Sequence, residues 1–144
     1  MKAMLLGFAL IGVMSTVLTA ATPNTVDTIE AQYNHCMDKP ENSTADFYQC
    51  IDEAYTSADA ELNKVYIEIK TSYSKNKDEN SKEIVKRLVA SERAWITYRD
   101  TNCELSGTQM LGGSGEGTMI GGCRVTETIS RIRALKSIFA GEPQ

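Results

Sequence analysis

Residues 45–73, ADFYQCIDEAYTSADAELNKVYIEIKTSY, decide the fold of this chain. Their apolar residues recur in steps of three and four, the spacing that places side chains on one face of an α-helix. That face consists of Phe47, Cys50, Ile51, Ala54, Ala58, Leu62, Val65 and Ile69. Thr44 is a suitable N-cap, and Asp46 lies in the first turn, where the helix dipole stabilises a carboxylate. The stretch therefore predicts one long amphipathic helix, which no glycine or proline interrupts.

A second and a third helix are predicted further along the chain. The polar segment 75–81, KNKDENS, ends at Ser81, a suitable N-cap for a helix over about residues 82–103. The expected apolar face of this second helix is Ile84, Leu88, Ser91, Trp95, Tyr98 and Asn102. The third helix is expected over about residues 121–139, because the apolar residues there recur at helical spacing up to Phe139.

The stretch between these two helices is rich in glycine. Seven of the ten glycines of the chain fall within residues 107–122: Gly107, Gly112, Gly113, Gly115, Gly117, Gly121 and Gly122. Because each glycine costs a helix about 0.8–1 kcal/mol relative to alanine, we expect a loop that tightens into helix near Thr118. Short connections make consecutive helices antiparallel. The predicted fold class is therefore all-α, a three-helix bundle with a glycine-rich loop between the second and third helices.

The first 21 residues have the pattern of a cleaved secretory signal peptide. Lys2 supplies a positive charge, the following residues are uncharged with an apolar centre, and Ala20 and Ala21 offer a cleavage site. An uncleaved anchor is the alternative, since the uncharged stretch could just span a bilayer. Cleavage would leave a periplasmic or secreted protein with no stable membrane insertion.

The chain is thus expected to divide into three parts. The signal peptide covers residues 1–21, an irregular segment covers residues 22–43, and one helical domain covers residues 44–140. The middle segment is expected to be irregular because it is polar and contains Pro23 and Pro40.

The charge of the chain narrows the class of partner. It holds 15 Lys and Arg against 19 Asp and Glu, and loss of Lys2 with the signal takes the net charge from −4 to −5. An acidic surface disfavours nucleic acid and anionic lipid and favours a basic protein partner. The simpler interpretation is that a modest negative charge keeps an exported protein soluble.

Four cysteines, Cys36, Cys50, Cys103 and Cys123, all follow the signal segment. An even count in an exported chain of this size indicates two disulfides. No two cysteines have C-x-x-C spacing and His35 is the sole histidine, so we expect neither a metal site nor a cofactor. Three antiparallel helices would bring all four thiols to one end. We favour Cys36–Cys50 with Cys103–Cys123, although clustered thiols leave crossed pairings open.

Two segments of the chain resemble the signature blocks of the LprI-like lysozyme inhibitor family. They are residues 58–66, ADAELNKVY, and residues 91–103, SERAWITYRDTNC. A third block of the family is matched in order by the Gly112-Gly113-Ser114 turn, Met119, Cys123, Thr128 and Arg131. The chain departs from the family in having Ser91-Glu92 where Ala-Gln is common, and in a loop richer in glycine. The resemblance implies a small exported bacterial protein, and some members of this family inhibit lysozyme.

The signature residues are interpreted as mainly structural: Asp59, Leu62, Asn63, Tyr66, Trp95, Tyr98, Arg99 and Asp100. Large aromatic residues at helical spacing usually belong to a core, so Trp95 is expected to be an anchor there. Arg99 or Asp100 would then pin a neighbouring helix, and the alternative is that both contact a partner. Asp59 and Glu61 point to different sides of a helix and have no catalytic histidine or thiol beside them, so no enzyme is predicted.

The segment GGSGEGTM, residues 112–119, has the glycines of a phosphate-binding loop but lacks its lysine. Small residues there would let the backbone enter a narrow cleft. Gly112, Gly113, Ser114 and Arg124 are therefore candidate partner-binding residues, and the alternative is a mere connection between helices. The predicted function is inhibition of a basic lysozyme by occluding its active-site cleft. The second hypothesis is a non-inhibitory envelope interaction module, such as an immunity or stress-response protein.

Overall fold

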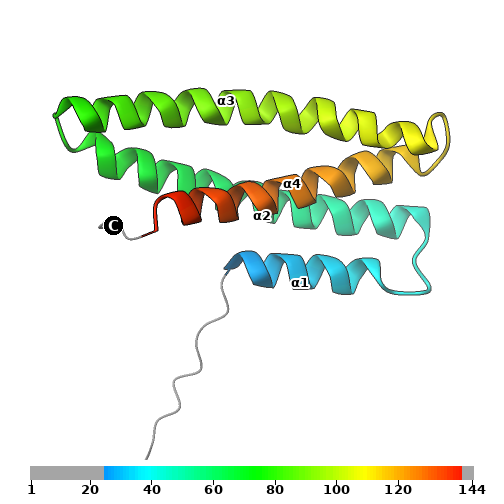
Figure 1. Ribbon diagram of the computed structural model, residues 1–144. Coiled ribbons are helices and arrows are strands. Elements are labelled where there is room, and N and C mark those ends of the chain that lie inside the picture. The colour runs from blue at the N-terminus through cyan, green and yellow to red at the C-terminus, as the bar shows by residue number, and fades with distance from the viewer. Residues whose placement is uncertain (1–24, 141–144) are drawn as a thin grey trace, which may run out of the picture.

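The computed structural model describes residues 25–140, which form four α-helices and one short 3-10 helix (Figure 1). In chain order they are α1 (Thr25–Met37), α2 (Thr44–Ser74), α3 (Glu79–Gly107), η1 (Thr108–Met110) and α4 (Glu116–Ile138). Consecutive helices run in opposite directions, so the α1–α2 and α3–α4 connections lie at the same end of the bundle (Figure 1). The all-α prediction is confirmed, with four helices in the described chain rather than three.

A signal peptide is expected at the start of the chain, and no stable membrane insertion is expected after its cleavage. The expected signal peptide, residues 1–21, lies outside the described residues. Within residues 25–140, no helix is long and apolar enough to cross a bilayer.

The expectation that residues 22–43 are irregular is wrong for the part that forms α1. The residues of α1 that enter or border the core are Val26, Ile29, Tyr33 and Met37. Their steps of three and four are a helical pattern, which the polar composition and the flanking prolines obscured. Arg133 of α4 also binds α1 through Asp27 at 2.9 Å and Glu30 at 2.6 Å, and its hydrogen bond to Glu30 lowers the pKa of that carboxyl group.

Side-chain caps fix where α2 and α3 begin. The N-cap of α2 is Ser43 rather than Thr44, and its N–H donates to the carboxylate of Asp46 at 2.8 Å in a capping box. The carboxylate of Asp78 caps α3 by accepting from the Ser81 N–H at 2.9 Å and from the Ser81 hydroxyl at 2.7 Å. These hydrogen bonds hold the pKa of Asp78 below its usual value. The N-cap therefore lies three residues before the one expected at Ser81, and the helix begins at Glu79.

α4 begins at Glu116, so the expected start near residue 121 is wrong. A Cβ atom on any of three α4 glycines would meet a side chain of another helix: Tyr48 for Gly117, Ile51 for Gly121 and Tyr33 for Gly122. The missing side chains let α1 and α2 approach α4 closely, and this packing offsets the low helix propensity of glycine. The run of glycines is therefore partly a packing surface rather than a loop.

Gly121→Ala is expected to lower the free energy of unfolding by about 1 kcal/mol. The added Cβ would lie 2.7 Å from Cγ2 of Ile51, which is 7% exposed and has little room to move. This overpacking is expected to outweigh the better helix propensity of alanine. The control is Gly115→Ala, whose nearest neighbour would be the Met110 side chain at 3.4 Å, an ordinary van der Waals contact. Urea unfolding followed by circular dichroism measures both, and equal stability of the two variants would contradict this packing role.

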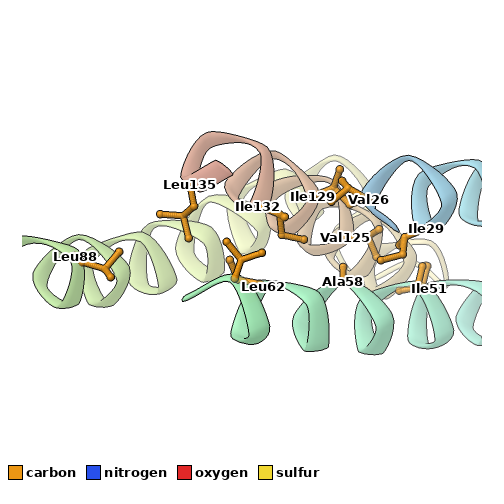
Figure 2. Packing of buried hydrophobic residues seen from close by; sticks show 12 residues of the cluster. Val26, Ile29, Ile51, Ala58, Leu62, Leu88, Val125, Ile129, Ile132 and Leu135 are labelled. Carbon is orange, nitrogen blue, oxygen red and sulfur yellow. The ribbon is translucent and has the colours of Figure 1, made fainter. Parts of the chain in front are cut away.

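The core is built around α4. Its buried apolar residues Val125, Ile129, Ile132 and Leu135 face α2, and α1 covers them from the side (Figure 2). The buried partners are Val26 and Ile29 of α1, Ile51, Ala54, Ala58, Leu62 and Val65 of α2, and Leu88 of α3. Each large aliphatic side chain removed from water contributes about 1.5–3 kcal/mol. α3 supplies one buried side chain to this cluster, Leu88, and packs the partly buried Trp95 against it, so further contacts help to hold α3 in place.

Both disulfides lie at the end of the bundle where the α1–α2 and α3–α4 connections are found. Cys36–Cys50 joins the end of α1 to the first turns of α2, with 5.7 Å between the Cα atoms. Cys103–Cys123 joins α3 to α4, with 5.4 Å between the Cα atoms. These are the pairs that the sequence favoured over crossed pairings.

Candidate partner-binding site

The connection between α3 and α4, residues 108–115, is a hydrogen-bonded turn that we call the tip. The Gly113 N–H donates to the Met110 carbonyl at 2.8 Å, and the Gly112 N–H donates to the carboxylate of Glu116 at 2.8 Å. Gly112 has a φ of 73°, a conformation that favours glycine. The Cys103–Cys123 disulfide joins the two helices on either side of the tip. Gly112, Gly113 and Ser114 therefore lie in an ordered turn.

The tip and the helix before it present apolar side chains to solvent. Leu111 is 74% exposed, Met110 is 52% exposed, and Leu105 at the end of α3 is 68% exposed. Ser114 is exposed beside them. Exposed apolar side chains grouped around a braced turn are typical of a protein-binding surface.

Arg124, the fourth candidate residue, does not belong to the tip. It lies in the third turn of α4, where its Nε is 3.6 Å from Oδ1 of Asp100 and its Nη2 is 4.0 Å from Oε1 of Glu104. Its Nε is buried and has no hydrogen-bonding partner. The structure thus brings Gly112, Gly113 and Ser114 together but places Arg124 against α3.

Polar contacts join α3 to α4 in addition to the apolar contacts of Leu88 and Trp95 with the core. The Arg131 guanidinium donates twice to one carboxylate oxygen of Glu92, from Nε at 3.0 Å and from Nη2 at 2.9 Å, and both side chains are only 12% exposed. Asn102 donates to Glu127 at 3.3 Å in the same interface. Together with the Asp100–Arg124 pair, these contacts favour the interpretation that Asp100 pins a neighbouring helix.

The predicted apolar face of α3 is wrong at Ser91 and Tyr98, both of which are exposed. The face that packs inward instead carries Leu88, Glu92, Trp95, Arg99 and Cys103, with Arg99 only 7% exposed. The prediction missed this face because two of its positions hold charged residues, Glu92 and Arg99. Charged residues are rarely buried unless they are paired, so the sequence pattern did not mark them as inward.

Glu92→Ala is expected to lower the free energy of unfolding by about 2 kcal/mol, because it leaves the mostly buried Arg131 guanidinium without its carboxylate. The control on the same helix is Glu83→Ala, whose partners Lys86 and Arg87 are both 79% exposed. Exposed pairs contribute at most about 1 kcal/mol, so the control is expected to be near neutral. The free energies of unfolding of the two variants follow from their denaturant midpoints and slopes. A control as unstable as Glu92→Ala would mean that the Glu92–Arg131 pair contributes no more than an exposed pair.

The other signature residues gather in a groove between α2 and α3, with a volume of about 330 Å³. Those that line it are Asp59, Leu62, Asn63 and Tyr66 from α2, and Trp95 and Arg99 from α3. Trp95 packs against the core from this side, as its expected role as an anchor requires. The guanidinium of Arg99 lies over the rings of Trp95 and Tyr55, at 5.1 and 5.5 Å from their centroids. The fold therefore brings the two signature blocks face to face, which spacing along the chain could not reveal.

The two carboxylates considered for acid–base chemistry have separate partners. Asp59 accepts a hydrogen bond from Asn63 at 2.9 Å, whereas Glu61, 8% exposed, binds Lys136 of α4 at 2.7 Å. Among residues 25–140, no three His, Cys, Asp or Glu side chains gather as a metal ion would require.

Known proteins are similar to the part of the chain that forms the helical bundle. Residues 36–135 match the family profile described as lysozyme inhibitor LprI. A protein of Rhizobium meliloti (strain 1021), described as uncharacterized protein R02472, is 35% identical over 103 residues, which cover 67% of this chain and 74% of the relative. No solved structure matches the chain significantly. The family match begins at the first cysteine and covers both disulfides, the groove and the tip.

Proposed function

Because this chain belongs to the family of LprI lysozyme inhibitors, we propose that it inhibits lysozyme by placing its tip across the active-site cleft of the enzyme. The family is one of inhibitors, so the chain is expected to bind an enzyme rather than to act as one. The observation that carries the proposal is the tip itself, a braced turn on which the apolar side chain of Leu111 is 74% exposed.

The order of the tip supports a role in tight binding. A turn already held by hydrogen bonds and a nearby disulfide loses little conformational freedom when it binds, so more of the contact energy appears as affinity. Gly112 and Gly113 allow close approach of the backbone to a cleft wall, and the hydroxyl of Ser114 can donate to a cleft carboxylate. Arg124 would act beneath the tip, by holding α4 against α3, rather than by reaching the enzyme.

Charge and export support the same partner. A net charge of −4 for the whole chain, or −5 without Lys2, would steer the protein toward a basic lysozyme, with association faster at low salt. The proposed signal peptide, residues 1–21, would deliver the protein to the periplasm or the medium, where lysozyme acts on cell walls.

Leu111→Asp is expected to weaken inhibition of a basic lysozyme about tenfold or more, because a charge would replace an apolar contact at the centre of the interface. Folding is expected to be unaffected, since Leu111 is 74% exposed. Ser114→Ala and deletion of residues 113–115 test the polar and backbone contacts of the tip in the same way. The inhibition constant of each variant is the quantity to measure.

The matched control is Ile138→Asp, which changes a 67% exposed side chain at the opposite end of α4. It is expected to inhibit as the unchanged protein does. If all three tip variants kept their full inhibition, another surface would have to be the inhibitory element.

A non-inhibitory envelope interaction is the second candidate. It is favoured because Glu92, Asp100 and Arg131 form ion pairs that hold α3 and α4 together. Residues with this role build a scaffold, and one scaffold can carry different binding surfaces. Capture of one specific envelope protein, with no inhibition of several types of lysozyme, would support this candidate over the first.

A further inference from the structure

The groove between α2 and α3 contains a buried cation whose donors are only partly used. The side chain of Arg99 is 8% exposed. Among the described residues, its one hydrogen bond runs from Nε to Oδ1 of Asp100 at 3.0 Å. The guanidinium lies over the rings of Trp95 and Tyr55, and these cation–π contacts are not hydrogen bonds from its N–H groups. The terminal nitrogens of Arg99 are therefore left to a ligand or to water in the groove.

The charges of the groove favour an anion. Its two carboxylates are already engaged, Asp59 with Asn63 at 2.9 Å and Glu92 with Arg131 at 2.9 Å. Three cations, Lys70, Arg93 and Arg99, line the same groove. The lining thus carries more positive than negative charge, in contrast to the acidic chain as a whole.

We propose that this groove binds a small carboxylate, with the terminal N–H groups of Arg99 as its donors and the Trp95 and Tyr66 rings beside its apolar part. A planar guanidinium matches a carboxylate through two parallel hydrogen bonds, and partial burial strengthens such a contact. The ligand is either the carboxylate end of a peptide or a simple organic acid, since both present the same group. The groove is separate from the tip, so carboxylate binding can be tested whether or not the protein inhibits lysozyme.

Trp95 is the single tryptophan of the chain, so its fluorescence reports directly on the groove. Titration of residues 22–144 with N-acetylglycine, a peptide-like carboxylate, is expected to give a saturable change in Trp95 emission. N-acetylglycinamide, which lacks the charge, is expected to bind at least about tenfold more weakly. The same change with the amide, or no change with either compound, would overturn the proposal.

A second pair of probes, propionate and propionamide, distinguishes the two sources of carboxylate. Tighter binding of N-acetylglycine than of propionate supports a peptide terminus as the ligand. Equal binding of the two acids supports any small organic acid. In both cases propionamide is expected to bind weakly, and an amide that binds as well as its acid contradicts a site for carboxylates.

Variants locate the site on Arg99. Arg99→Gln is expected to lose at least about tenfold in affinity for N-acetylglycine, while Arg87→Gln, an exposed change on α3 outside the groove, is expected to keep it. If Arg99→Gln does not fold, the Arg99 side-chain resonances of the unchanged protein serve instead, because bound carboxylate is expected to shift them. Full affinity in a folded Arg99→Gln variant, or unshifted Arg99 resonances at saturation, would rule the site out.

Discussion

Ile132→Ala is expected to lower the free energy of unfolding by about 3 kcal/mol, one of the largest effects that a single substitution in this domain can have. Ile132 is completely buried in α4 and packs in the cluster that joins α4 to α2 (Figure 2). Removal of its outer carbons costs their transfer free energy and leaves a cavity that the helices close only in part. Equilibrium unfolding in urea, followed by circular dichroism, measures the change.

The control is Ile138→Ala, six residues later on the same helix, where the side chain is 67% exposed. It removes the same atoms from a side chain at the last residue of α4, so the difference between the two variants reports mainly on burial. The control is expected to lie within about 0.5 kcal/mol of the unchanged protein. Similar losses at both positions would mean that Ile132 does not lie in the core described here.

Loss of the Cys103–Cys123 disulfide has an expected effect of similar size, about 3 kcal/mol. The bridge closes a loop with a sequence separation of 20 residues, and the cross-link limits the freedom of the unfolded chain. It also ties α3 to α4 across an interface that contains the Glu92–Arg131 ion pair, and Cys103 is completely buried. The double variant Cys103→Ala with Cys123→Ala tests this by chemical unfolding under oxidising conditions.

This disulfide is expected to affect inhibition as well as stability. Without it the tip would lose its brace, so the double variant is expected to inhibit lysozyme more weakly even at temperatures where it is folded. Removal of Cys36–Cys50, which closes a loop with a separation of 14 residues, is the matched control for stability. It is expected to cost a similar free energy but to leave the affinity of the folded protein unchanged. Equal loss of inhibition in both folded variants would argue against a specific role of the brace.

The sequence predicts α2 almost to the residue, since the expected range 45–73 compares with Thr44–Ser74. The prediction succeeds because one uninterrupted apolar face decides the helix and no competing signal exists. It fails for α1 because that helix carries only two buried residues, Val26 and Ile29, within a polar segment. Such a helix forms because α2 and α4 offer a surface to cover, which is a property of the assembled bundle.

The first turns of α4 could not be predicted for a related reason. Gly117, Gly121 and Gly122 lower helix propensity, and only the presence of Tyr48, Ile51 and Tyr33 against them turns small size into an advantage. Local preference therefore pointed to a loop, while close packing between helices determined the outcome.

The candidate site was predictable only in part. The glycines mark the tip, yet its apolar surface comes from Leu105, Met110 and Leu111, which no motif distinguished. The position of Arg124 depends on the carboxylates that α3 presents to it, and these are known only once the helices are paired. The groove around Arg99 likewise depends on how α2 and α3 face each other.

The most direct measurement is lysis of a bacterial cell-wall suspension by a basic lysozyme, with and without oxidised residues 22–144, at two salt concentrations. Occlusion of the cleft by the tip predicts inhibition that rises with dose, saturates near one inhibitor per enzyme, and weakens at high salt because the charges that steer association are screened. No inhibition at a large molar excess, against several types of lysozyme, would mean that the protein is not a lysozyme inhibitor.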